Sequence, residues 1–227
     1  MTETAAEHGI SSYLPHEGPR KGLAFCMSGG GDRAALFHLG ALRRMNELGI
    51  LSKIDTFTSV SGGSIMAAQL ATFMQSATRE PGKLIEGFEE GVAKPMRRFA
   101  AADPRTGAAL ARLKPNKWFT PGAQSEALSA AYSQGPAPGK LADLPEKPRF
   151  VFLASDMRFR DQWVFDTGKR QVGSGPAGHA PLGDWTLAQA VAASSCVPGA
   201  FGVVHTTWEP GELTGGLYAE PDRDRLV

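Results

Sequence analysis

The sequence contains very little cysteine. Cys26 and Cys196 are the only two in 227 residues. This number excludes a disulfide framework and a metal site built from four cysteines. Both residues stand among apolar neighbours, so we expect buried free thiols in a reducing compartment, which favours a cytoplasmic location.

The chain also lacks an excess of charge of one sign and a long hydrophobic run. Lys and Arg total 24 against 23 Asp and Glu, so the formal net charge is +1 and a nucleic acid partner is not expected. Glu3 and Glu7 stand where a signal peptide needs a basic start and an apolar run. No apolar stretch approaches the roughly 18 to 20 residues that span a bilayer. We therefore expect any membrane contact to be peripheral.

Two successive strand-turn-helix patterns open the chain. Residues 22–27 are a continuous apolar run, typical of a strand buried on both faces. Residues 36–45 repeat Leu and Met at helical spacing, and Gly49 suits a C-terminal cap. Residues 54–60 and 61–74 repeat the pattern. This order predicts an α/β fold, a three-layer sandwich with a mostly parallel central sheet.

Proline and glycine divide the remainder of the chain. Residues 78–147 are cut by proline into short helices and loops, which indicates an insertion or cap. We expect a strand pair in 149–168, a loop in 171–184, a helix in 185–196, and strands in 201–208 and 211–218. A chain of this length forms one core, so we expect a polar lead (1–21), one domain (22–220) and a short polar tail (221–227).

Three consecutive glycines, Gly29, Gly30 and Gly31, follow the first predicted strand. One interpretation is a dinucleotide site, which requires an acidic residue at the end of the second strand. Asp55 instead stands at the beginning of that strand. The alternative is an oxyanion hole, in which backbone N–H groups point at developing negative charge. Arg33 then lies in the first helical turn, where a guanidinium suits a phosphate.

Ser61 occupies the apex of the second turn. A strand-to-helix elbow that exposes a serine requires small residues two positions away on either side, and Ser59 and Gly63 meet this requirement, with Gly62 between. The hydroxyl would stand at a helix N-terminus, where the dipole favours an alkoxide-like oxygen. The simpler interpretation is a helix cap, a role for which Ser64 is also available.

Basic side chains outnumber acidic ones in residues 91–119, where apolar residues are interleaved with them. Such a segment is compatible with contact to an anionic lipid surface. The alternative is a solvated basic face above an apolar contact with the core.

The two turns together resemble those of one known family. "SGGGDRAALFHLGALRRM" followed by "SVSGGSIMAA" is similar to the patatin-like phospholipases. "VFLASDMRFRDQWVF" is similar to the strand pair of that family, and "LAQAVAASSCVPGAFGVV" to its A-S-x-x-x-P-x-x-F segment. The resemblance covers roughly residues 22–218.

The resemblance implies an acyl hydrolase with a Ser-Asp dyad and without a metal or organic cofactor. Ser61 would be the nucleophile, and the backbone of Gly29 to Gly31 would form the oxyanion hole. Arg33 would face the phosphate of the substrate or assist the oxyanion. The expected partner is a lipid or phospholipid substrate.

The chain departs from the family pattern at the dyad aspartate. The family has Asp-Gly-Gly or Asp-Gly-Ala after the "PGAF" segment, whereas this chain has Thr214 followed by Gly215 and Gly216. A threonine hydroxyl is not a useful base near neutral pH. The replacements that we consider are His205 and the tail residues Asp222 and Asp224. Other candidates are expected to be turn, surface or packed residues: Asp156, Asp166, Asp184, His38 and His179.

Two functions therefore remain open. The first is a phospholipase A-type hydrolase or carboxylesterase that forms an acyl-enzyme on Ser61. The second is an inactive or shortened relative that keeps the fold and binds lipid.

Overall fold

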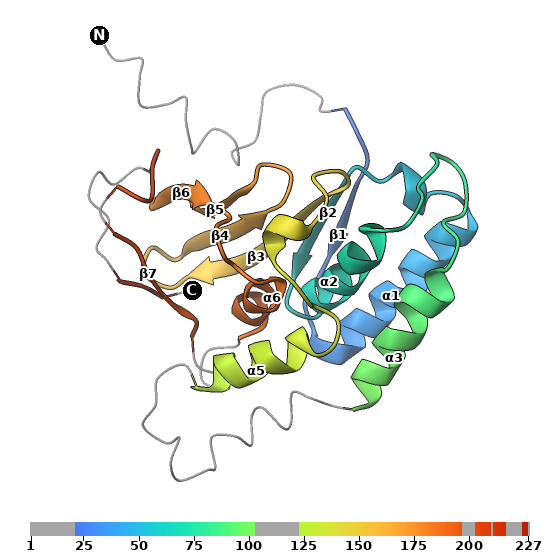
Figure 1. Cartoon of the computed structure of the whole chain (residues 1–227), viewed down its shortest axis with the longest axis horizontal. Helices are drawn as coiled ribbons and strands as arrows, with labels where there is room; N and C mark the ends of the chain where they lie inside the picture. The colour runs from blue at the N-terminus through green and yellow to red at the C-terminus, as the bar shows by residue number, and fades with distance from the viewer. Residues whose placement is uncertain (1–20, 103–122, 197–202, 210, 217–223, 227) are drawn as a thin grey trace.

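The computed structural model describes residues 21–102, 123–196, 203–209, 211–216 and 224–226. Its centre is a sheet of six strands in the order β1-β2-β3-β4-β5-β6 (Figure 1). These strands are β1 (Ala24–Met27), β2 (Thr56–Val60), β3 (Arg149–Asp156), β4 (Asp161–Asp166), β5 (Gln171–Ser174) and β6 (Gly178–Pro181). The sheet is parallel from β1 to β3 and antiparallel from β3 to β6.

Helices flank this mixed sheet, so the predicted α/β fold is confirmed. They are α1 (Gly31–Glu47), α2 (Gly62–Met74), α3 (Lys94–Ala101), α5 (Ala123–Ser133) and α6 (Leu187–Ser195). Shorter helical segments are η2 (Leu51–Lys53), η3 (Glu89–Ala93) and η6 (Leu141–Asp143). Helix α2 contacts α1, α6 and β2, which explains why it is apolar nearly all round.

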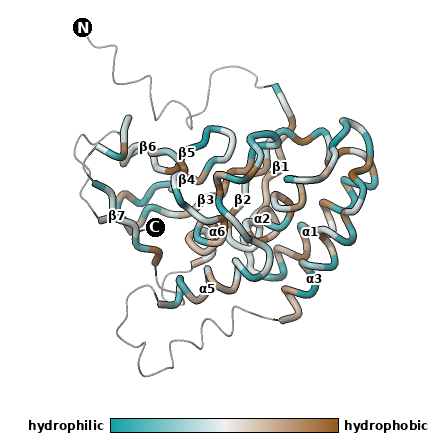
Figure 2. The backbone as a smooth tube through the Cα atoms, viewed as in Figure 1, coloured by the Kyte–Doolittle hydropathy of each residue, from teal (hydrophilic) through white to brown (hydrophobic). Residues whose placement is uncertain are grey.

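The described parts of the proline-rich segment belong to the same core as the sheet. Val92, Met96, Leu128 and Tyr132 are fully buried members of the central hydrophobic cluster. Figure 2 shows hydrophobic stretches in the strands of the sheet, and α3 and α5 reach this core by packing against α1 and α6. The described parts of this segment therefore complete the core.

Two basic residues in the described part of residues 91–119 are engaged with acids. Lys94 pairs with Glu90, and Arg97 pairs with Glu89. Met96, an apolar residue that stands between these basic residues in the sequence, is buried. These contacts favour the interpretation of a solvated basic face above the core for residues 91–102, while residues 103–119 lie outside the described part.

The prediction of a loop in residues 171–184 is wrong. Strands β5 and β6 form an antiparallel hairpin there, with Val172 paired to Ala180. The glycines that suggested a loop instead allow the two strands to approach each other closely. A Cβ on Gly173 would stand 2.1 Å from the carbonyl oxygen of Gly178. Both glycines adopt positive φ, at 147° and 95°.

The C-terminal expectations are correct only in part. Strand β7 (His205–Thr207) lies within the predicted strand 201–208, whose first two residues are outside the described part. The predicted strand 211–218 is absent over residues 211–216, where Thr214 forms an isolated bridge to His179. The predicted polar tail contains a strand, β8 (Asp224–Leu226), paired with β7. Backbone pairing forms this strand, so side-chain patterning did not reveal it.

The first strand is more exposed than its apolar sequence predicts. In β1 only Met27 is buried, and Cys26 is exposed. Cys196 is half-buried, so neither cysteine is the fully buried thiol that we expected. The face of β1 that carries Ala24 and Cys26 is not covered by the residues that the structure describes.

The two strand-turn-helix units touch through their glycines. A Cβ on Gly62 would stand 2.1 Å from the carbonyl oxygen of Gly31, and one on Gly63 would stand 2.4 Å from that of Met27. Real Cβ atoms do not approach backbone this closely, so only glycine permits the contact. The start of α2 is thereby held against the end of β1 and the start of α1.

This contact predicts opposite effects for two glycine-to-alanine changes. Gly63→Ala is expected to lower the free energy of unfolding by about 1–3 kcal/mol, because its methyl group overpacks a backbone contact. Gly40→Ala in α1 is the matched control, since a Cβ there meets nothing within 4 Å. The control is expected to raise stability by roughly 0.5–1 kcal/mol through helix propensity. Urea unfolding measures both, and equal effects would contradict the packing that we describe.

Candidate active site

Ser61 stands in a strained turn between β2 and α2. Its φ of 52° and ψ of −117° lie outside the regions that non-glycine residues prefer, and such strain costs of order 1–3 kcal/mol. The helix starts immediately, because the N–H groups of Ser64 and Ile65 donate to the Ser61 carbonyl oxygen. Ser61 is half-buried, so its side chain is reachable from solvent.

The helix-cap interpretation does not fit this geometry. Ser61 is the N-cap residue of α2, yet its hydroxyl makes no capping hydrogen bond. The hydroxyl of Ser64 lies within hydrogen-bond distance of Ser59 and Ser194 instead. The Ser61 hydroxyl is therefore available for chemistry rather than used to close the helix.

The triple-glycine turn lies directly against Ser61. A Cβ on Gly29 would stand 3.2 Å from the Cβ of Ser61. Gly30 and Gly31 have positive φ, at 136° and 65°, and Gly31 is the first residue of α1. Two helix N-termini thus begin beside one serine, where partial positive charge favours an anion. The structure brings together the residues that the sequence predicted for the elbow and the oxyanion hole.

The acid that a dinucleotide site needs is elsewhere. The carboxylate of Asp55 accepts the backbone N–H of Leu23 at 2.9 Å. Asp55 precedes β2, whereas the glycine turn faces the end of that strand. This placement argues against the dinucleotide interpretation.

A buried histidine supports the glycine turn from behind. His38 is 3% exposed, and its Nε2 lies 3.1 Å from the carbonyl oxygen of Ser28. A carbonyl oxygen only accepts, so Nε2–H donates this bond. Edge contacts with Phe25 and Phe37 hold the ring. The sequence predicted only a packed or half-exposed residue here, because a bond to the backbone carries no pattern in the sequence.

Arg33 lies on the exposed side of α1, in its first turn. No salt bridge of Arg33 occurs among the described residues. Its guanidinium is therefore available at the helix end that adjoins Ser61.

A cavity of about 250 Å³ adjoins the elbow. Val60, which precedes Ser61, and Ser194, whose Oγ accepts the Ser61 N–H, both line it. The remaining lining residues are Leu153, Ala154, Ser155, Met157, Gln162, Ala193, Cys196 and Val203. Most of this wall is apolar, and the polar ends of Ser155 and Gln162 contribute hydrogen-bonding groups.

Thr214 lies far across the sheet from Ser61. Residue pairing runs in steps from Val60 through Leu153, Val164, Gly173 and His179 to Thr214. Five spacings of about 4.8 Å amount to roughly 24 Å in a flat sheet. The Thr214 hydroxyl donates to the His179 carbonyl oxygen at 3.3 Å. The structure does not bring Thr214 together with the elbow.

The other candidate bases are also engaged elsewhere. Asp156 is buried and accepts two backbone N–H groups of its own turn and the hydroxyl of Ser174. Asp166 pairs with Arg149, and Asp184 pairs with Lys140. Within the described ranges, no carboxylate or imidazole is hydrogen-bonded to the Ser61 hydroxyl. Asp222 lies outside these ranges, as does the side chain of Asp224.

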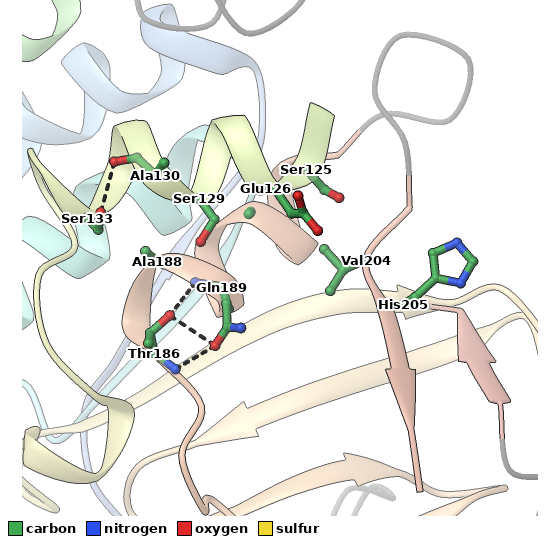
Figure 3. Close-up of a pocket in the computed structure, with 11 residues that line it drawn as sticks. Ser125, Glu126, Ser129, Ala130, Ser133, Thr186, Ala188, Gln189, Val204 and His205 are labelled. Carbon is green, nitrogen blue, oxygen red and sulfur yellow. Dashed lines mark hydrogen bonds between the residues drawn. The ribbon is translucent and has the colours of Figure 1, made fainter. Parts of the chain in front are cut away.

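His205 lines a second cavity of about 710 Å³ between α5 and α6 (Figure 3). Three serines of α5 line one side of it, namely Ser125, Ser129 and Ser133. The other side is lined by Thr186, the N-cap residue of α6, and by Ala188 and Gln189 of that helix. The imidazole of His205 lies beside Val204, at one end of the residues that line this cavity. The structure thus places His205 with this second cavity and not with the elbow.

The described part of the chain has neither a membrane-spanning helix nor a metal-binding cluster. None of its helices combines the length and apolarity needed to cross a bilayer. It also holds no group of three or more His, Cys, Asp or Glu side chains arranged for a metal ion.

Comparison with known proteins identifies one family. The model of the family described as patatin-like phospholipase matches residues 25–220, which include both glycine turns, the β3–β4 pair and α6. This is a family of lipid acyl hydrolases. No curated protein matches the chain.

The buried His179 predicts a pH dependence of stability. Burial lowers its pKa below the usual 6.5, the positive charge of Lys169 lowers it further, and Asp166 opposes this. The free energy of unfolding is therefore independent of this group above about pH 6.5 and decreases as the pH falls below that value. The reason is that His179 binds a proton more readily in the unfolded chain than in the folded protein. Urea unfolding at pH 8 and pH 5.5 measures this decrease. The free energy of unfolding is expected to fall more between the two pH values for the parent than for His179→Asn. Equal losses would contradict the burial effect.

Proposed function

Because the chain belongs to the patatin-like phospholipase family, we propose that it hydrolyses carboxylic esters of lipids through an acyl-enzyme on Ser61. One observation carries this proposal. The backbone of Gly29 packs against a serine that stands at a helix N-terminus in a strained turn with a reachable side chain. An acyl-transfer site needs this combination of nucleophile and oxyanion donors.

The proposed reaction has two steps. In the first, Ser61 Oγ attacks the ester carbonyl carbon, and the negative charge on the carbonyl oxygen is stabilised by the N–H groups of the glycine turn and the two helix N-termini. The C–O bond to the alcohol then breaks, and the alcohol leaves with the proton that the Ser61 hydroxyl has released. In the second, water attacks the acyl-Ser61 ester, the bond to Ser61 Oγ breaks, and a proton from the water returns to Oγ as the fatty acid is released. Arg33 is proposed to hold the phosphate of a phospholipid near this helix end.

The weak point of the reaction is the proton acceptor. The described residues offer no base bonded to Ser61, so we expect acylation and deacylation both to be slow, with the oxyanion hole as the main support of each step. This same observation favours a second candidate function, a lipid-binding protein without turnover. Covalent labelling of Ser61 by a fluorophosphonate separates the two, because only an activated serine reacts.

The cavity beside the elbow suggests the size of the acyl group. About 250 Å³ is below the range of roughly 300–1,000 Å³ for pockets of drug-sized ligands. We therefore propose that the site encloses a short acyl group or part of a longer one. Val60 and Met157 line this cavity and are exposed. A peripheral contact with a lipid surface at this rim is part of the proposal.

The proposed nucleophile is tested by paired serine substitutions. Ser61→Ala is expected to reduce hydrolysis of p-nitrophenyl butyrate at least 100-fold, since no acyl-enzyme forms without the hydroxyl. Ser76→Ala, an exposed position just beyond the other end of α2, is the matched control and is expected to match the parent. Initial rates with purified protein measure the effect. Equal rates for Ser61→Ala and the parent would refute the proposal.

The position of Thr214 predicts that an aspartate introduced there does not restore a dyad. The turn lies across the sheet from Ser61, so Thr214→Asp is expected to change the rate of ester hydrolysis less than threefold. A general base in contact with the serine would instead raise it by about 10²-fold or more. A rise of that size would show that this turn approaches Ser61, contrary to the strand pairing.

A further inference from the structure

Three serine hydroxyls form a cluster beneath the elbow. Ser59 belongs to β2, Ser64 to the first turn of α2, and Ser194 to the last turn of α6. Ser64 Oγ lies 3.0 Å from Ser59 Oγ and 2.8 Å from Ser194 Oγ. All three side chains are at most 9% exposed. The cluster therefore links two helices and a strand at the base of the proposed nucleophile.

Ser194 is the member of this cluster that contacts Ser61 itself. Its Oγ accepts the backbone N–H of Ser61 at 2.9 Å, across 133 residues of sequence. It also donates to the carbonyl oxygen of Leu153 in β3 at 2.6 Å. The Ser64 hydroxyl donates its own single proton to Ser59 Oγ, so the 2.8 Å approach of Ser64 to Ser194 is a close contact between two hydroxyls whose protons are directed elsewhere. The hydroxyl of Ser194 thus accepts from the elbow and donates to β3 at the same time.

The N–H of Ser61 depends on this partner. An N-cap N–H lies outside the hydrogen-bond ladder of its helix and is satisfied in many proteins by a long side chain at the third helical position. In α2 that position is Ser64, whose short side chain points into the hydroxyl cluster. Among the described residues, Ser194 supplies the acceptor that the helix itself does not.

We propose that Ser194 is a positioning residue that holds the Ser61 backbone in its strained conformation and so fixes the direction of the nucleophilic hydroxyl. The inference rests on the proposed function of Ser61. Loss of the acceptor removes the interaction that opposes relaxation of the turn, and any rotation of the Ser61 backbone turns Oγ away from the glycine turn. The hydrogen bond to the Leu153 carbonyl oxygen holds the Ser194 hydroxyl against β3, and the contact with Ser64 holds it against α2.

Three variants separate this role from ordinary packing. Ser194→Ala removes the hydroxyl, and Ser194→Thr restores it, with the adjoining cavity open to the added methyl group. Ser195→Ala is the matched control, because Ser195 is an equally buried neighbour whose hydroxyl donates to Val191 within the same helix. If Ser194→Ala does not fold, Ser194→Cys takes its place, since a thiol keeps the volume and weakens the bond.

Two readouts are taken on each full-length variant: the hydrogen-exchange rate of the Ser61 amide by NMR, and the rate at which a fluorophosphonate labels Ser61. Ser194→Ala is expected to speed exchange and slow labelling, each about tenfold, as for loss of one buried hydrogen bond. Ser194→Thr should return both toward the parent, and Ser195→Ala should change neither by more than twofold.

The two readouts distinguish the possible failures. Unchanged exchange in Ser194→Ala, or equal loss of labelling in Ser194→Ala and Ser195→Ala, would overturn the positioning role. A parent that exchanges slowly but is never labelled would refute the proposed function of Ser61, while the exchange rates would still establish that Ser194 holds the turn.

Discussion

The structure depends on the close approach of two glycine turns. Gly62 and Gly63 lie against the backbone of Gly31 and Met27 at distances that exclude a Cβ atom. This contact joins the first strand-turn-helix unit to the second at the edge of the sheet where parallel strands end. Both helix N-termini then point at the same place, and Ser61 stands between them. Any larger side chain at these glycines separates the nucleophile from its proposed oxyanion donors.

Polar contacts from α6 and α1 support the strained Ser61 and the glycine turn beside it. Ser194 accepts the N–H of the strained residue, and His38 holds the carbonyl of the residue before the glycine turn. Both supports are buried, where hydrogen bonds are shielded from competition with water. The elbow is thus anchored from the sheet, from α1 and from α6, whereas the proton acceptor that would complete a dyad is not present among the described residues around it.

The sequence was sufficient for features that are local. The glycine turns, the elbow and the first two helices follow from residues within about ten positions of one another, because turn chemistry and helical periodicity are short-range. The hairpin 171–181 was missed because glycine marks loops and close strand contacts alike. The place of Thr214 follows from pairing with β6, and the role of Ser194 from a contact over 133 residues, and neither has a local signature.

Ser61 is proposed to form a covalent acyl intermediate. Mass spectrometry of the protein, quenched in acid during turnover of p-nitrophenyl butyrate and digested, tests it directly. We expect one butyryl group on the peptide that contains Ser61, absent after hydroxylamine treatment. An unmodified Ser61 peptide in a sample that releases p-nitrophenol, or a butyryl group on another residue, would contradict it.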